Sequence, residues 1–238
     1  MVLRIAAAAD LHCLPATAAQ TRSAFKAIAT QADLILLAGD LTSHGQPDQA
    51  QVLADATKDI DLPIFACMGN HDMHYERMSE LIPIWEAAGI TVLEREHTIC
   101  DVAGKRVGIV GLKGFVGGFA DSSMADYGEP LMRELFAMTT VDVDDLSKGL
   151  EAIGDCHIRL VLMHYAPTAD TLVGEPEGLW SMLGSDRFAE PIRKHKPDLV
   201  LHGHAHAGTF AGAIDDVPVY NVAIPVMRRD FWIFELDV

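Results

Sequence analysis

The apolar residues of this chain fall into two patterns, short continuous runs and helically spaced positions. Short continuous runs indicate buried strands, and spacing at i, i+3 and i+4 indicates amphipathic helices. Buried strands are predicted in the N-terminal part at residues 2–9, 33–38 and 63–68. Helices are predicted after each of them at residues 19–31, 47–59 and 76–88. This strand–helix alternation is typical of a parallel sheet.

The C-terminal part has shorter, mixed elements. A hairpin is predicted at residues 97–102 and 105–111, joined at Ala103-Gly104. Further strands are predicted at residues 158–163, 198–202, 207–214, 217–222 and 231–237. Helices are predicted at residues 130–153 and 185–195, and long loops at residues 112–128 and 166–184. With no repeat or linker in view, we expect one α/β domain over residues 1–238, with two sheets and outer helices.

Composition and charge exclude several classes of protein. Half of the 238 residues are hydrophobic, which is ample for a core and excludes intrinsic disorder. No apolar run approaches the ~18 residues of a membrane span. The 34 acidic and 18 basic residues give a net charge of −16, which argues against holding nucleic acid by charge. If such a chain handles phosphate, a metal centre would serve to neutralise it.

The cysteines and the start of the chain bear on the compartment. Cys13, Cys67, Cys100 and Cys156 have no CxxC spacing, so reduced thiols and a cytoplasmic location are expected. The alternative for residues 1–10 is a signal peptide. The apolar stretch is short and ends at Asp10, which favours a buried strand.

Candidate ligands follow the predicted strands. The carboxyl ends of strands in α/β sheets form the edge where ligands bind. The residues there are Asp10, His12, Asp40, Asn70, His71, His164, His204 and His206. In an extended chain, residues two apart point the same way, so Asp10 and His12 can face one point, as can His204 and His206. Without His71, the set contains two Asp, one Asn and four His. That is more ligands than one tetrahedral zinc ion can bind, and it suits two divalent ions that share a carboxylate.

These blocks resemble a known family. Asp10-Leu-His12, Gly39-Asp40, Gly69-Asn70-His71-Asp72, His164 and Gly203-His204-Ala205-His206 are similar, in order and placement, to the signature of the calcineurin-like metallophosphoesterases. The resemblance implies a four-layer α/β/β/α sandwich of two mixed sheets flanked by helices. It implies that Asp10, His12 and His206 hold one metal, that Asn70, His164 and His204 hold a second, and that Asp40 bridges them. It also implies that His71 binds the phosphoryl oxygen and protonates the leaving alkoxide.

The chemistry agrees with this resemblance. Two divalent ions outweigh the charges of Asp10, Asp40 and a bridging hydroxide, so the centre stays cationic and can receive phosphate. Bound water of lowered pKa supplies hydroxide at neutral pH for in-line attack on phosphorus. Manganese, iron or zinc are the expected metals. The expected function is hydrolysis of a small-molecule phosphoester by this hydroxide, with phosphodiesters preferred because the Gly-Asp and Gly-Asn-His-Asp blocks resemble those of small bacterial-type phosphodiesterases.

Several alternatives stay open. A phosphomonoesterase, a nucleotide pyrophosphatase of the same fold, or a metal-site scaffold for protein interaction would share these motifs, and a homodimer is compatible with the sequence. A protein Ser/Thr phosphatase is disfavoured because no Arg follows Asp40 closely.

Asp72 either orients His71 or fixes its turn. His202 is expected in the core or behind the ligands, and His44 and His74 follow motif loops and could line the pocket. Thiol ligation by Cys13 or Cys67 is disfavoured.

The two long loops carry large side chains and cations. The large side chains of these loops are slightly more expected to line the pocket than to pack only on each other or to form a dimer contact. They are Phe115, Phe119, Tyr127, Trp180 and Met182. Lys113 and Arg187 could reach a substrate phosphate.

Overall fold

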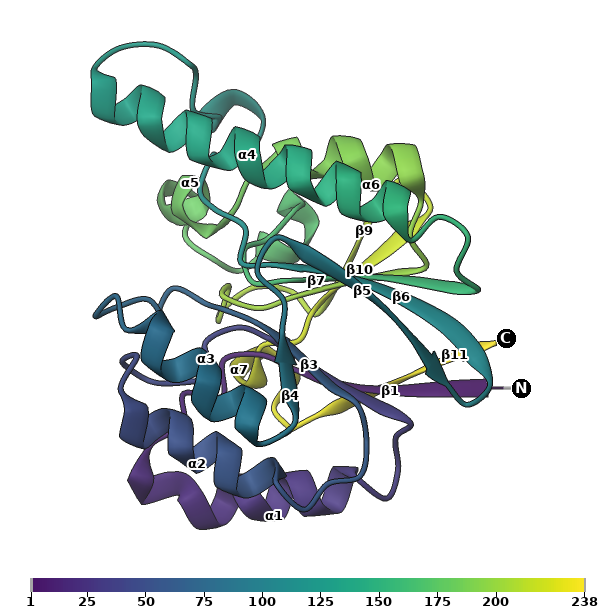
Figure 1. Ribbon diagram of the computed structural model, residues 1–238. Helices are drawn as coiled ribbons and strands as arrows, with labels where there is room; N and C mark the ends of the chain where they lie inside the picture. Colours follow the sequence, from purple (N-terminus) through teal and green to yellow (C-terminus); the bar gives the residue numbers. More distant parts are fainter. Residues whose placement is uncertain (1, 238) are drawn as a thin grey trace.

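The computed structural model describes residues 2–237, which form two β-sheets packed face to face between two layers of helices (Figure 1). The five-stranded sheet has the order β11-β1-β2-β3-β4 and the six-stranded sheet the order β5-β6-β7-β8-β10-β9. Helices α1, α2 and α3 cover the outer face of the first sheet, and α4 and α6 cover the outer face of the second. The expected four-layer α/β/β/α sandwich is confirmed.

The five-stranded sheet is parallel apart from one edge strand. Its strands are β1 (Val2–Ala8), β2 (Leu34–Ala38), β3 (Ile64–Cys67), β4 (Ile90–Val92) and β11 (Trp232–Asp237). Strands β1 to β4 pair in parallel, and β11 pairs antiparallel with β1. The helices between these strands are α1 (Ala18–Ile28), α2 (Pro47–Thr57) and α3 (Met78–Ala87). Pro83 lies inside α3 without ending it.

The six-stranded sheet is mixed. Its strands are β5 (Glu96–Val102), β6 (Lys105–Leu112), β7 (Ile158–Met163), β8 (Leu199–His202), β9 (Ala211–Ile214) and β10 (Val217–Asn221). The helices between its strands are α4 (Pro130–Ala152), α5 (Trp180–Leu183) and α6 (Ala189–His195), and α7 (Ile224–Met227) leads from β10 back to β11 of the first sheet. Short 3-10 turns lie at Pro15–Thr17, Ala120–Ser122, Ala169–Leu172, Glu177–Leu179 and Asp186–Phe188.

The alternation of side chains along the strands explains the layers. Side chains of a strand point to opposite faces in turn. On β7, Leu160 and Leu162 join the core cluster between the sheets, whereas Val161 and Met163 join the cluster under α4 and α6. Both faces of this sheet are therefore covered, which accounts for the continuous apolar runs.

The structure corrects several expected boundaries. The helix expected over residues 185–195 is a 3-10 turn followed by α6, and the strand expected over 207–214 is the shorter β9. Strand β4 and helices α5 and α7 were not predicted. Among residues 2–237, no helix is both long and apolar enough to cross a membrane.

Candidate metal centre

The two sheets bring their strand ends to one edge, and the predicted residues gather there. Asp10 and His12 follow β1, Asp40 follows β2, and Asn70 and His71 follow β3. His164 follows β7, and His204 and His206 follow β8. Three overlapping groups of ligand atoms result, each with all atoms within 4.8 Å of one another. Asp10, His12 and His206 form the first cluster, and Asp40, His164 and His204 form the second. The third group, His12, Asp40 and His71, links the two clusters because it shares His12 with the first and Asp40 with the second.

Asp40 belongs to the second cluster and also lies beside His12 of the first. Its Oδ1 is 3.4 Å from Nε2 of His164, and its Oδ2 is 3.9 Å from Nε2 of His12. Oδ1 of Asn70 is 3.0 Å from the same His164 nitrogen, so Asn70 adjoins the second cluster. Asp40 is only 1% exposed, so its carboxylate is removed from water except through the centre itself.

The backbone brings these side chains together differently from the extended geometry expected at the strand ends. The φ angles of Asp10, His12, Asp40 and His204 are 59°, 45°, 50° and 70°, in the left-handed region. Simple alternation therefore does not explain why Asp10 and His12 converge. Such backbone is uncommon outside glycine and is held by its surroundings. Here the N–H of Asp10 donates to the carbonyl of Gly39, and the N–H of His12 donates to the carbonyl of Asp40.

Main-chain carbonyls orient three of the imidazoles. Nδ1 of His164 donates to the carbonyl of Ala38 at 2.9 Å, and Nε2 of His204 donates to that of Met182 at 3.2 Å. Nδ1 of His71 donates to the carbonyl of Ser43 at 2.7 Å. Because a carbonyl only accepts, each bond places the proton on that nitrogen and leaves the opposite one as an acceptor when the ring is neutral. Metal-binding histidines are oriented in this manner. No signal in the sequence identified these carbonyls.

This arrangement fits a divalent cation. Once Nδ1 of His164 carries the proton, its Nε2 and the Asp40 carboxylate face each other as two acceptors with no hydrogen between them. A cation satisfies both groups. The mixture of imidazole nitrogens with carboxylate and amide oxygens suits zinc, iron or manganese.

Burial sets the protonation of the cluster. It lowers the pKa of His204 to about 3 and lowers that of His12, so both rings are neutral and able to bind metal. Burial raises the pKa of Asp40 above its usual value. Burial also acts to raise the pKa of Asp10, but the hydrogen bond from His206 and the neighbouring imidazoles outweigh it and lower that pKa. The same bond, 2.8 Å long, raises the pKa of His206.

A sequence model of the calcineurin-like phosphoesterases matches residues 3–208, which include every residue of both clusters. The chain belongs to the calcineurin-like phosphoesterase family.

Solved structures of the same fold belong to several different kinds of protein. The protein TT1561 of Thermus thermophilus is 18% identical over 98% of this chain and 99% of its own, with a TM-score of 0.60. The phosphopantetheinyl hydrolase of Mycobacterium tuberculosis is 14% identical over 98% and 95%, with a TM-score of 0.63. GAP50, described as the anchor in the inner membrane complex of Plasmodium, is 12% identical over 94% and 72%, with a TM-score of 0.59. These likenesses establish the fold alone. A comparison with curated proteins found no match.

Asp72 of the phosphoesterase Gly-Asn-His-Asp block fixes the turn. Its buried carboxylate accepts the N–H groups of Leu41, Thr42 and Gly69 at 3.1, 2.8 and 2.9 Å, and the Thr42 hydroxyl at 2.6 Å. It therefore joins the loop after β2 to the loop after β3. His71 is oriented instead by the carbonyl of Ser43.

The remaining candidates lie outside the two clusters. Burial raises the pKa of Cys13 to about 12 and also raises that of Cys67, so both thiols are protonated. His202 is buried, with its Nε2 2.8 Å from the hydroxyl of Thr171. At the rim, the His44 ring lies 6.5 Å from that of His71 and 6.1 Å from that of His74.

The loop cations are engaged within the chain. Lys113 is buried and donates from Nζ to the carbonyl of Gly114, beside the rings of Phe115 and Tyr165. Arg187 binds the carbonyl of Phe136 and the hydroxyl of Thr140.

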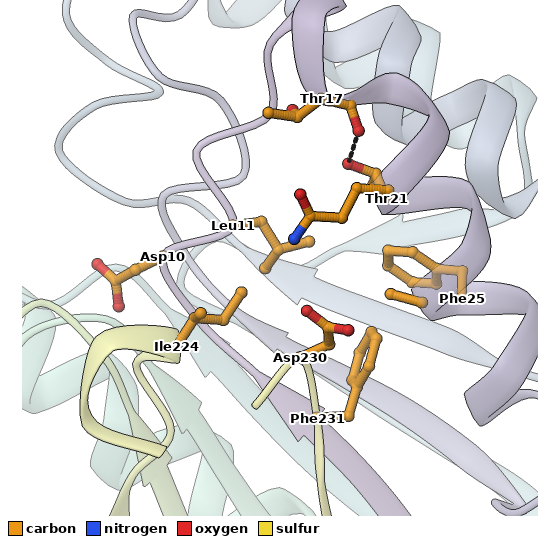
Figure 2. A pocket seen from close by; sticks show the side chains of 10 residues that line it. Asp10, Leu11, Thr17, Thr21, Phe25, Ile224, Asp230 and Phe231 are labelled. Atoms are coloured by element: carbon orange, nitrogen blue, oxygen red, sulfur yellow. Dashed lines mark hydrogen bonds between the residues drawn. The ribbon is translucent and has the colours of Figure 1, made fainter. Parts of the chain in front are cut away.

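A separate hollow lies behind the β1–α1 loop, between α1 and residues 224–231 (Figure 2). Its cavity volume is about 140 Å³, and its walls include Leu11, Phe25 and Phe231. The Asp10 carboxylate points away from it (Figure 2). Asp10 is the one ligand residue among those that line the hollow, so the hollow adjoins the metal centre but is not the metal centre itself.

Proposed function

We propose that this protein is a dimetal phosphoesterase that hydrolyses small-molecule phosphoesters, with phosphodiesters as its preferred class. The observation that carries the proposal is the buried Asp40 carboxylate, which lies 3.4 Å from Nε2 of His164 in the second cluster and 3.9 Å from Nε2 of His12 in the first. A single carboxylate in this position suits two cations held side by side, which is the arrangement used for in-line displacement at phosphorus.

Each cluster holds one divalent ion in this proposal. Asp10, His12 and His206 bind the first, Asn70, His164 and His204 bind the second, and Asp40 binds both. Manganese, iron or zinc suit these donors. When bound, the ions supply water of lowered pKa and stabilise the charge on the phosphoryl oxygens.

His71 is the general acid. The backbone N–H of His71 donates to Oδ1 of Asp40 at 2.8 Å, and this bond fixes His71 beside the metal centre. Its side chain is 40% exposed, and Nε2 lies 3.9 Å from Oδ2 of Asp40. With Nδ1 bonded to Ser43, the proton that His71 can give to a leaving alkoxide is the one on Nε2.

A scaffold role is the second candidate, since the anchor protein GAP50 shares the fold. The retention of both ligand clusters together with His71 favours the enzyme. The diester preference over monoesters and nucleotide pyrophosphates derives from the resemblance of the motif loops to small phosphodiesterases.

The test is His71→Ala with metal content and leaving-group dependence measured together. Both ions should remain, while hydrolysis of an alkyl ester falls by about 10²–10⁴ because its alkoxide needs the proton. A nitrophenyl ester of the same phosphate should lose less, since its leaving group departs as the anion. His97→Ala, an exposed histidine on β5, is the control and should match the parent protein. Equal losses on both esters would contradict the general-acid role, and metal-loaded protein inert to all phosphoesters would contradict the enzyme.

A further inference from the structure

The hollow between α1 and residues 224–231 has the size of a small organic ligand (Figure 2). Its cavity volume is about 140 Å³, and an apolar cavity of about 150 Å³ accommodates a benzene ring. Phe25, which is 1% exposed, lies at its inner side, whereas Gln20 and Asp230 are exposed and lie toward solvent. One ring can therefore enter the hollow and lose much of its contact with water.

Most of the wall of the hollow is apolar. Leu11 belongs to the β1–α1 loop and Phe25 to α1, while Ile224 begins α7 and Phe231 directly precedes β11. The rings of Phe25 and Phe231 meet edge to face, with their centroids 5.0 Å apart. Aromatic rings prefer this geometry, and a third ring can pack against the pair in the same way. These walls favour an aryl group or a compact alkyl group.

The charged groups that line the hollow are both carboxylates. They belong to Asp10, whose carboxylate points away, and to Asp230, whose carboxylate is turned toward the middle of the hollow (Figure 2). None of the ion pairs that Lys and Arg form within residues 2–237 engages Asp230. The guanidinium of the neighbouring Arg229 lies over the ring of Trp232 instead, 4.4 Å from its centroid. A cation that enters the hollow would therefore be attracted, and an anion repelled.

The hollow shares a wall with the loop of the first cluster. Leu11 lies between Asp10 and His12 in the sequence, and its side chain lines the hollow. The N–H of Ile224 donates to the carbonyl of Ala9 at 3.1 Å, which joins a second wall to the same loop. An occupant would contact this loop from the side opposite to the Asp10 carboxylate, and would leave the ligand atoms uncovered (Figure 2).

We propose that this hollow binds a small organic cation in which an ammonium group is attached to one aryl ring or a compact alkyl chain. The apolar part packs against Leu11, Phe25 and Phe231, and the ammonium group pairs with Asp230. The site goes beyond the proposed function, because it needs neither metal ions nor a phosphoester. Its Kd is on the order of 1 mM, because the ligand has few atoms and the carboxylate is exposed.

The test titrates the zinc-loaded protein at pH 7 with three probes of similar size and follows the amide signals by NMR. The probes are benzylammonium, benzyl alcohol and benzoate. Benzylammonium should shift the amide signals of Leu11, Ala24 and Phe231. It should bind about threefold to fivefold tighter than benzyl alcohol, because an exposed ion pair contributes modestly. Benzoate should leave these three signals in place, including when it binds at the metal centre.

Two variants with matched controls locate the site. Ala24→Leu adds bulk to the wall of the hollow and should weaken benzylammonium binding by about tenfold or more, because its added atoms take the place of the ligand. Ala27→Leu, three residues later on α1 and outside the lining of the hollow, should bind as the parent does. Asp230→Asn should abolish the preference for the ammonium over the alcohol. Asp216→Asn, at an exposed hairpin turn, should keep that preference.

Three results would overturn the site. The first is the absence of shifts at Leu11, Ala24 and Phe231 with benzylammonium at tenfold above the expected Kd. The second is equal affinity of the parent protein for the ammonium and the alcohol, and the third is unweakened binding to the Ala24→Leu variant. All three leave the phosphoesterase proposal standing, because that proposal depends on the two clusters of ligand atoms and not on the hollow.

Discussion

Asp72 shows how a residue outside both clusters determines their geometry. Its fully buried carboxylate receives four hydrogen bonds from the loops that carry Asp40 and Asn70. Hydrogen bonds to a charged acceptor contribute more than neutral ones, and an unpaired buried donor is costly. Asp72 thus positions residues from two strands at once.

Asp72→Asn should lower the free energy of unfolding by about 2–4 kcal/mol, because the amide turns an N–H group toward donors that then lack an acceptor. Urea denaturation measures the change. Asp216→Asn, at an exposed hairpin turn, is the control and should stay within about 0.5 kcal/mol of the parent. A similarly small change at Asp72 would show that these bonds do not hold the loops.

The buried Glu94, which lies outside the metal centre, makes the stability of the fold depend on pH. Burial raises its pKa to about 7, and its Oε2 has no hydrogen-bond partner among the described residues. A carboxyl whose pKa is higher folded than unfolded stabilises the fold while protonated, and this stability is lost as the pH rises from about 4.5 through 7.

Glu94→Gln should therefore be more stable than the parent at pH 8 by about 1–2 kcal/mol, with the advantage shrinking toward pH 5. Denaturation at both pH values gives the comparison. Glu96→Gln, two residues later and exposed, is the control for loss of a surface glutamate and should stay within about 0.5 kcal/mol of the parent. An advantage for Glu94→Gln that is equal at both pH values would contradict ionisation as its cause.

At the scale of elements, the close approach of the two sheets at the metal centre depends on glycine. Gly39, between β2 and Asp40, has a φ of +83°, and an added Cβ would lie 2.5 Å from Nδ1 of His164. A side chain there would push His164 away from the carbonyl of Ala38. The glycine of this motif is thus required for both backbone conformation and space.

Gly39→Ala should cost about 3 kcal/mol or more in stability, and should weaken metal binding, since it adds a clash to the ~1 kcal/mol of a left-handed alanine. Gly104→Ala is a matched control. Its φ is +75°, and an added Cβ would meet nothing within 4 Å, so only the backbone cost should appear. Thermal melts and metal titration distinguish the two, and equal losses would exclude the contact with His164.

The elements also show which features could be predicted from sequence. The strands that carry the ligand blocks were predicted because they are buried on both faces and therefore almost wholly apolar, with one arginine near the start of β1 and one near the start of β7. Strand β4 and helices α5 and α7 have three or four residues each, too few to show a period. The convergence of Asp10 with His12 was expected for the wrong reason, because left-handed backbone leaves no mark in the sequence. The carbonyls of Ala38, Ser43 and Met182 were missed since any residue supplies one.

For the whole molecule, the candidate centre lies on the seam between the two sheets. Asp10, Asp40 and Asn70 follow strands of one sheet, and His164 and His204 follow strands of the other. Direct bonds across the seam already join Ala9 to Val222 and to Ile224. Ions bound there would join the sheets further, and their charge would offset part of the net −16 of the chain.

Removal of bound ions should therefore lower the melting temperature of the entire fold. Ligands that bind only the folded chain stabilise it by ~2.7 kcal/mol at a hundredfold excess over Kd, which corresponds to about 5–10 °C for a chain of this size. Calorimetry of manganese-loaded and chelated protein measures the difference. If the Asp40 carboxylate is shared by both ions as proposed, Asp40→Asn should abolish the response and lose most of both ions, whereas Asp10→Asn should keep one ion and part of the response. An Asp40→Asn variant that retains two ions per chain would show that the carboxylate does not bridge.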